Sequence, residues 1–182
     1  RTTITIKNLR SAFVPAPYPA LGVSGLKGPW QIQRMGLTIK SARSDTRGQT
    51  YTINSIKIAP TADQMRELSS RFRPSLEPYL KLPPKMPTVI SDTAREVTKD
   101  AATDYDKALA LQQYLRNGSF RYSESAPVAD GYDGNGVAVI AKFLEAKAGY
   151  CVHFSSTMAV MARTLGVPSR IAVGYAPGDV ID

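Results

Sequence analysis

The sequence has 182 residues, of which 43% are hydrophobic and 21% are charged, and its formal net charge is +8. This length and hydrophobicity suit one or two small domains with a buried core and exclude an intrinsically disordered chain. No apolar stretch approaches the roughly 18 residues needed to cross a bilayer. The chain contains one cysteine and one histidine, so an internal disulfide is excluded and no metal site is expected.

The positive charge is concentrated in the N-terminal half. Residues 1–90 contain 14 Lys or Arg and 4 Asp or Glu, whereas residues 91–182 contain 9 and 11. Such asymmetry is typical of surfaces that meet polyanions, phospholipid headgroups or nucleic acid. The basic residues are scattered and aromatic residues do not interleave with them, so we expect a solvated basic face and no nucleic-acid partner.

Residues 1–73 are predicted to form a β-rich module. Thr and Ile alternate at the N-terminus, and β-branched residues dominate the last strand candidate. The proline-rich segment 15–22 is predicted to be a connection, because it cannot be a central strand. Strands of a small antiparallel sheet are expected at four places: 2–6, 30–34, 37–40 and 51–59.

The rest of the chain is predicted to be a connector followed by a helical region, which makes the fold class α+β. Residues 74–87 contain five prolines and are expected to be an ordered connector that lies against residues 88–182. A buried strand is predicted at 169–175, and a turn is predicted around Asp130, Asp133 and Asn135, whose spacing does not fit a calcium loop. Helices are expected from Pro87 to about Lys99, from Thr103 or Asp104 to Asn117–Gly118, from Val137 to Lys147 with Gly149 ending it, and from about Cys151 to Gly166.

Cys151 is the candidate catalytic residue. It follows Gly149 and Tyr150 at the predicted start of a helix, where unpaired amides and the helix dipole favour a thiolate. The same amides are placed to receive an oxyanion when the thiolate attacks a carbonyl group. The alternative is that Cys151 is a small buried hydrophobic residue without a chemical role.

His153 is not expected to be the partner of this thiol. Residues two apart on a helix are rotated by about 200°, so their side chains leave opposite faces. A Cys–His pair needs hydrogen-bond reach of about 3 Å. We therefore expect His153 to be a partly buried side chain with its own hydrogen-bond partner, and a base for Cys151 to come from elsewhere.

The segment from Gly149 to Tyr175 resembles the nucleophile region of the transglutaminase-like superfamily. A weaker resemblance upstream, at Tyr79–Pro83, Tyr105–Ala108 and Tyr114–Arg116, is to the extracytoplasmic region of bacterial membrane-anchored members. The positions that carry the main resemblance are Gly149-x-Cys151, Phe154-Ser155, Arg163-x-Leu165-Gly166-Val167-Pro168-x-Arg170 and Gly174-Tyr175.

This resemblance implies a β-rich N-terminal module, then helices and the start of a papain-like transglutaminase core. It also implies a Cys-His-Asp triad, of which only the cysteine carries over, to Cys151. The His and Asp would follow the strand that ends near Tyr175, so we expect residues 1–182 to be a fragment that is inactive or nearly so. No cofactor is expected, and the parent protein is expected to be membrane-anchored.

The implied activity is acyl transfer on a protein or peptide substrate, from a glutamine carboxamide or peptide carbonyl to an amine or water acceptor. Two alternatives stay open. One is a thiol peptidase or amidase on the same fold. The other is a non-catalytic envelope or polyanion-binding module, whose binding would fall steeply with salt and survive Cys151→Ala.

Overall fold

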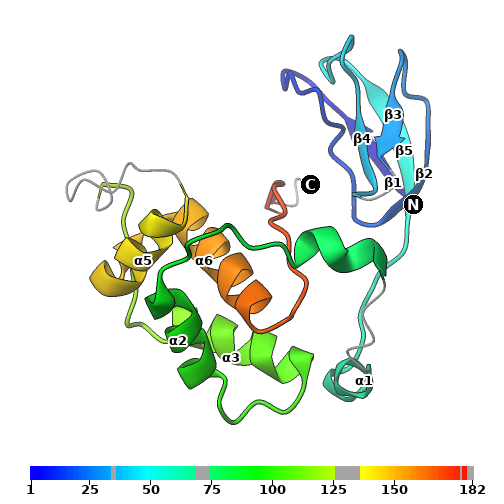
Figure 1. The fold of residues 1–182 in the computed structure, drawn as a ribbon. Coiled ribbons are helices and arrows are strands. Elements are labelled where there is room, and N and C mark those ends of the chain that lie inside the picture. The colour runs from blue at the N-terminus through cyan, green and yellow to red at the C-terminus, as the bar shows by residue number, and fades with distance from the viewer. Residues whose placement is uncertain (34–35, 69–73, 126–135, 177, 180–182) are drawn as a thin grey trace. The chain divides into compact units, whose positions relative to one another are not determined.

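The computed structural model describes residues 1–33, 36–68, 74–125, 136–176 and 178–179 (Figure 1). Backbone contacts divide the chain into two compact units, Arg1–Ala59 with Val173–Asp182, and Pro60–Ala172. The division by composition into residues 1–73, 74–87 and 88–182 stays a prediction. The division by backbone contacts is a separate one and falls after residue 59.

The first unit contains a three-stranded antiparallel sheet in the order β1-β5-β2. These strands are β1 (Thr2–Thr5), β2 (Ala20–Ser24) and β5 (Thr50–Ser55), and Ile53 of the central strand faces Thr2 on one side and Val23 on the other. A separate two-stranded sheet joins β3 (Gln31–Gln33) to β4 (Thr38–Lys40). The core of the unit is formed by Ile6, Val14, Ile39, Tyr51 and Ile53.

Strands are present at the four predicted places, but they do not form one sheet, because among the described strands β3 and β4 pair only with each other. A second correction concerns segment 15–22. Residues Ala20–Gly22 of that segment belong to strand β2 and are not part of a connection. The prolines end at Pro19, directly before the strand, and β2 lies at the edge of the sheet, where a neighbouring proline removes no hydrogen bond of the sheet.

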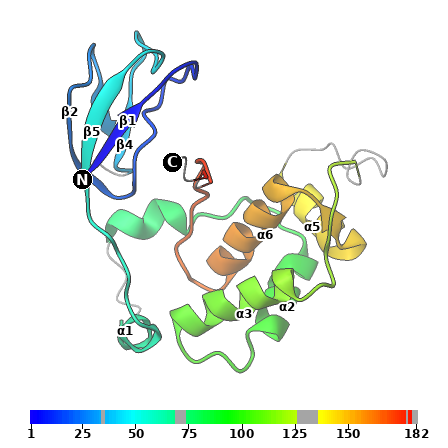
Figure 2. The same ribbon diagram turned by 180° about the vertical axis from the view of Figure 1, so that it is seen from behind.

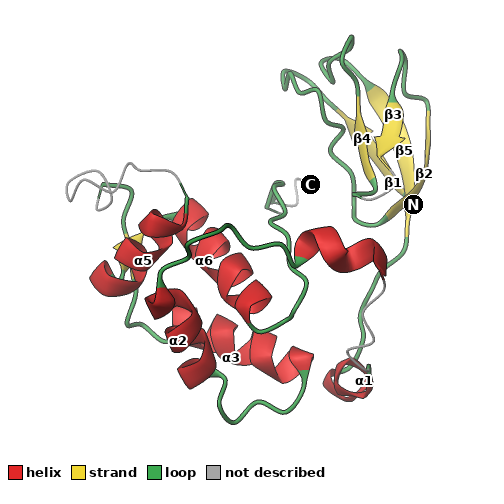
Figure 3. Ribbon diagram, viewed as in Figure 1, coloured by secondary structure: helices red, strands yellow, loops and turns green. Residues whose placement is uncertain are grey.

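The second unit is mainly helical (Figures 2 and 3). Helix α6 contacts α2, α3 and α5, and the buried side chains of these four helices form one core with Phe120. A short parallel pair joins β6 (Arg121–Tyr122) to β7 (Ala148–Gly149), and β7 comes directly before α6 in the chain. The helices are α1 (Ala62–Glu67), a 3-10 helix (Pro74–Tyr79), α2 (Thr88–Val97), α3 (Asp104–Arg116), α5 (Val137–Ala146) and α6 (Cys151–Thr164).

The four predicted helices are present, and their ends lie within two residues of the expected ones. Helix α5 ends at Ala146, one residue before the expected Lys147. Its C-cap is Lys147, which adopts a left-handed conformation with φ 50°, and Gly149, which was expected to terminate the helix, belongs to β7. The short helix α1 was not expected within the β-rich module. Its signal in the sequence is a capping box, in which the side chains of Thr61 and Gln64 each accept a hydrogen bond from the other residue's backbone N–H.

The predicted strand at 169–175 is wrong. These residues have no regular structure, and the side chain of Val173 is 97% exposed. A strand requires hydrogen bonds to a neighbouring strand, and none of the described strands pairs with this segment. In the described part of the chain, no helix is long and apolar enough to span a membrane.

Candidate functional site

Cys151 is the first residue of α6, with Tyr150 as the N-cap. The Cys151 side chain is exposed, and the neighbouring Val152 is 53% exposed. The alternative of a small buried cysteine is therefore wrong for this structure. An exposed thiol at the positive end of a helix can approach a substrate from solvent, which a buried one could not.

The first turn of α6 leaves backbone donors beside this thiol. The N–H groups of His153 and Phe154 donate to the carbonyl oxygen of Tyr150, at 2.9 and 3.3 Å. No described residue accepts a hydrogen bond from the N–H of Cys151 or Val152. These two donors point along the helix dipole and are available to an oxyanion formed near the sulfur.

Gly149, two residues before α6, has no room for a side chain. A Cβ atom added at Gly149 would lie 2.9 Å from Cδ2 of Phe143 and 3.0 Å from Cγ of His153. Gly149 also pairs with Tyr122 across the β6–β7 ladder, and its carbonyl oxygen accepts a hydrogen bond from the Ser123 N–H at 2.8 Å. The absence of a side chain therefore lets β7 lie directly against the core that supports α6.

His153 is 7% exposed and faces the core, as expected. Its Nδ1 accepts a hydrogen bond from the backbone N–H of Tyr150 at 3.3 Å. Its ring stacks on Phe143 with centroids 5.9 Å apart and meets the Tyr150 ring edge-on at 4.5 Å. The expectation that His153 has its own partner is thus confirmed.

An exposed aromatic residue beside the site was not singled out from the sequence. Tyr122 is 60% exposed and stacks on Phe154, with ring centroids 6.3 Å apart. Its register opposite Gly149 places it alongside the strand that leads into Cys151. The signal in the sequence was weak, since β6 contains only two residues.

The Arg163-to-Arg170 part of the motif has a structural role in this fold. Arg163 donates from Nη1 to the carbonyl oxygen of Lys81 at 2.9 Å, and from Nη2 to that of Ser169 at 2.8 Å. Ser169 in turn donates from Oγ to the carbonyl oxygen of Ala159 at 2.7 Å and from N to that of Tyr79 at 3.1 Å. Arg163 therefore ties residues 79–81 and the chain after α6 to the helix that carries Cys151.

Two further expectations concern other positions. The predicted turn at Asp130, Asp133 and Asn135 lies outside the described residues. Among the residues that are described, no group of three or more His, Cys, Asp or Glu side chains could hold a metal ion.

Residues 91–181 match the sequence profile of the transglutaminase-like superfamily. A protein of Bacillus subtilis strain 168 named "Uncharacterized protein YebA" is 33% identical over 102 residues, which cover 56% of this chain and 13% of that protein. A "Protein-glutamine gamma-glutamyltransferase" of Pseudomonas aeruginosa is 33% identical over 72 residues, which cover 39% of this chain and 10% of that protein. The chain thus spans a small part of the curated relatives that it matches.

Two solved structures of the periplasmic domain of TgpA from Pseudomonas aeruginosa share the fold. The first aligns with 98% of this chain and 57% of that domain, at a TM-score of 0.70 and 17% identity. The second, bound to ethylmercury, aligns with 91% of this chain and 54% of that domain, at a TM-score of 0.64 and 16% identity. The predicted α+β fold is confirmed by the observed strands and helices and by this likeness.

Proposed function

The chain belongs to the transglutaminase-like superfamily, and from this premise we propose that Cys151 is the nucleophile of a thiol-dependent acyl transfer on protein or peptide substrates. The observation that carries the proposal is the exposed Cys151 thiol at the first position of α6, beside two backbone N–H groups that have no acceptor among the described residues. The name of the Pseudomonas aeruginosa relative supports glutamine carboxamides as substrates.

The reaction has two steps. The sulfur of Cys151 attacks the carboxamide carbon, and the N–H groups of Cys151 and Val152 donate to the oxygen that becomes negative. The C–N bond then breaks, the nitrogen takes up a proton and leaves as ammonia, and a thioester remains on Cys151. A primary amine or water next attacks the thioester carbon, the C–S bond breaks, and the thiol is regenerated.

The proton transfers need a base, and the chain's single histidine does not serve as one. His153 is buried on another face of the helix and engages Nδ1 with Tyr150. We therefore expect residues 1–182 by themselves to transfer acyl groups slowly or not at all. A chain that also supplies a histidine and an aspartate to the thiol, as the family resemblance implies, is expected to be active.

The experiment compares the protein that carries these residues with its Cys151→Ala and Cys151→Ser variants, and with residues 1–182 alone. Each is incubated with glutamine-containing peptides and a tagged primary amine, and the products are identified by mass spectrometry. We expect amine adducts with loss of ammonia in the unsubstituted protein and none in either variant. Cleavage or deamidation that requires Cys151 would instead establish the thiol peptidase or amidase.

Two results would contradict the proposal. Adducts that form equally well in Cys151→Ala would show that another residue carries the reaction. A protein that is folded by circular dichroism but gives no Cys151-dependent product on a broad peptide set would favour the non-catalytic binding module.

An extracytoplasmic location is part of the proposal, supported by the likeness to a periplasmic domain. Since Cys151 is exposed and is the single cysteine of this sequence, its labelling reports the location. A maleimide that does not cross the inner membrane should label Cys151 in cells whose inner membrane is intact. Labelling that occurs only after this membrane is broken would place the residues in the cytoplasm.

A further inference from the structure

Positive charge gathers at one end of the three-stranded sheet. Because β1 and β2 both run antiparallel to β5, the loops that follow β1 and β2 and the loop that precedes β5 leave the sheet at the same end. Five exposed cations lie on these three loops, and we call them the basic end: Lys7, Arg10, Lys27, Arg43 and Arg47.

Backbone hydrogen bonds hold these loops together. The N–H of Gly48 donates to the carbonyl oxygen of Ile6 at 3.0 Å, and that of Thr46 donates to Ser11 at 3.1 Å. The Lys27 backbone forms two hydrogen bonds with the side chain of Gln49, of 3.1 and 2.9 Å. The cations are therefore carried on connected loops, which limits the freedom of each loop to move away from its neighbours.

Acidic side chains do not balance the charge of the basic end within residues 1–59. Residues 1–59 contain nine Lys or Arg and a single acidic residue, Asp45. Asp45 accepts a hydrogen bond from the backbone N–H of Arg47 at 2.9 Å. In the described part of this segment, no Lys or Arg forms an ion pair, and the ion pairs of the described chain lie between residues 63 and 145.

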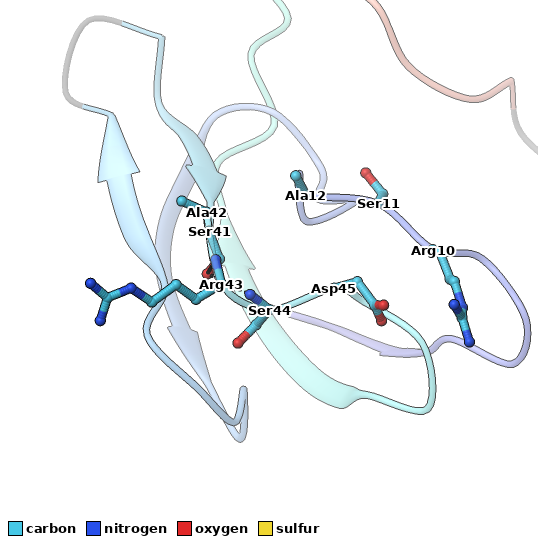
Figure 4. A pocket seen from close by; sticks show the side chains of 8 residues that line it. All are labelled: Arg10, Ser11, Ala12, Ser41, Ala42, Arg43, Ser44 and Asp45. Carbon is cyan, nitrogen blue, oxygen red and sulfur yellow. Dashed lines mark hydrogen bonds between the residues drawn. The ribbon is translucent and has the colours of Figure 1, made fainter.

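Two residues of the basic end, Arg10 and Arg43, line a shallow hollow of about 380 Å³. Figure 4 shows that the side chains of Arg10 and Arg43 extend away from one another, with Ser44 and Asp45 between them. Two guanidinium groups that diverge cannot clamp one phosphate between them. This arrangement suits many separate phosphates spread over an extended surface.

We propose that the basic end binds the surface of a bilayer rich in anionic phospholipids, through the phosphates of the headgroups. Single-stranded nucleic acid suits it less well, because such sites add aromatic side chains on which bases stack. Trp30 packs against the core and donates from Nε1 to the Lys27 carbonyl oxygen at 2.8 Å, whereas Phe13 and Tyr18 are exposed on the loop after β1. Five exposed cations against two exposed rings favour contacts with phosphates over the stacking of bases. The inference does not depend on the chemistry proposed for Cys151.

The test measures sedimentation of residues 1–182 with lipid vesicles. Vesicles contain either phosphatidylcholine alone or phosphatidylcholine with about a third of phosphatidylglycerol. We expect binding to the anionic vesicles alone, and its loss near 1 M salt, where the screening length falls to about 3 Å. Each cation near such a surface strengthens binding about five-fold, so the variant Lys7→Gln, Arg10→Gln, Arg43→Gln, Arg47→Gln should bind at least about 100-fold more weakly.

A matched control removes four exposed cations elsewhere. Lys57→Gln, Lys81→Gln, Lys85→Gln and Arg116→Gln change the net charge by the same amount and should leave most of the binding intact. Exchanging Lys for Arg and Arg for Lys at the four substituted positions of the basic end should also preserve binding, which would show that substitutions there leave the loops folded. Cys151→Ala should bind as the unsubstituted chain does.

Several outcomes would overturn the proposal. Equal weakening in both four-fold variants would show that net charge alone is responsible, and equal binding to uncharged vesicles would show that phosphate charge is not recognised. Release by millimolar glycerol phosphate would indicate a site for a single phosphate group. Tighter binding to a single-stranded oligonucleotide than to vesicles at the same salt would make nucleic acid the partner.

Discussion

The backbone N–H of Tyr150 donates a hydrogen bond to Nδ1 of His153, three residues later in the chain, at 3.3 Å. A glutamate at the third position of a helix closes a capping box in the same way. His153 therefore stabilises the turn that presents Cys151, and it does so from the buried side of α6. His153, two residues after Cys151 in the chain, therefore helps to hold Cys151 in position.

Substitutions of His153 test whether it stabilises the start of α6 or acts as a base for Cys151. Gln can still accept the Tyr150 N–H, so His153→Gln should be more stable than His153→Ala, which we expect to lose about 1–3 kcal/mol. Urea unfolding measures the difference. In the protein that carries these residues, both folded variants should keep amine incorporation within about ten-fold. A loss as complete as that of Cys151→Ala would assign His153 a catalytic role.

Gly149→Ala is expected to destabilise the chain by about 1–3 kcal/mol, because the new Cβ overlaps Phe143 and His153 and the core must shift. Thermal and urea unfolding measure this loss. Gly174→Ala is the matched control, since no atom lies within 4 Å of a Cβ at Gly174. An equal effect of the two substitutions would show that the contacts at Gly149 do not matter.

The helical unit could be predicted from sequence because local signals agree with the packing. The start of α3 is given by Thr103, whose side chain accepts the Asp106 N–H, and its end by Asn117 and Gly118. The strand expected at 169–175 failed because its apolar pattern shows only that the segment could pair. Pairing also requires a neighbouring strand, and the apolar periodicity of residues 169–175 gives no information on whether such a strand is present.

The candidate site was predictable to a similar extent. The position of Cys151 at a helix start follows from the Gly149 and Tyr150 that precede it and from the apolar spacing after it. Its exposure does not follow, because the sequence left a small buried cysteine open as the alternative. The position of Tyr122 does not follow, because a strand of two residues has no periodicity and its register opposite Gly149 depends on contacts distant in sequence. The role of Arg163 was also hidden, since two of its acceptors are backbone carbonyls.

Arg163→Ala should destabilise the chain by about 1–3 kcal/mol, since it removes hydrogen bonds from a charged donor to Lys81 and Ser169. Arg163→Lys should recover little, because an ammonium cannot span the acceptors that the planar guanidinium reaches. Arg95→Ala, which breaks an exposed ion pair with Asp92, is the control and should change stability by less than about 0.5 kcal/mol. Full recovery of stability in Arg163→Lys would mean that a positive charge at this position is sufficient and that the planar guanidinium is not required.

Thr157→Val is expected to stabilise the chain by about 1 kcal/mol. Thr157 is fully buried, and its Oγ1 has no hydrogen-bond partner among the described residues. Replacing this hydroxyl by a methyl group of similar size removes a desolvation cost without opening a cavity. Thr98→Val is the control and should be destabilising, because the buried Thr98 donates to the Ala94 carbonyl oxygen at 2.8 Å. A loss of stability in Thr157→Val would indicate that its hydroxyl does have a partner.

Asp106 makes part of the stability depend on pH. Its carboxylate accepts hydrogen bonds from the Thr103 hydroxyl at 2.7 Å and from Nε of Arg66 at 2.9 Å, which joins α1 to α3. The Thr103 hydroxyl, and next the Arg66 guanidinium, hold the pKa of the Asp106 carboxyl below its ordinary value. A carboxyl whose pKa is lowered by folding contributes stability above its unfolded pKa of about 3.9 and loses it as the pH falls through the folded pKa.

Asp106→Asn should therefore be less stable than the unsubstituted chain at pH 7, and this difference should shrink as the pH falls through the lowered pKa of Asp106 and its carboxylate becomes protonated. Urea midpoints at pH 7, 4 and 2 measure it. Arg66→Gln removes one of the two partners, so it should lower the midpoint at pH 7 and reduce the further effect of Asp106→Asn in the double variant. A difference between Asp106→Asn and the unsubstituted chain that stays constant down to pH 2 would show that the carboxylate charge contributes nothing.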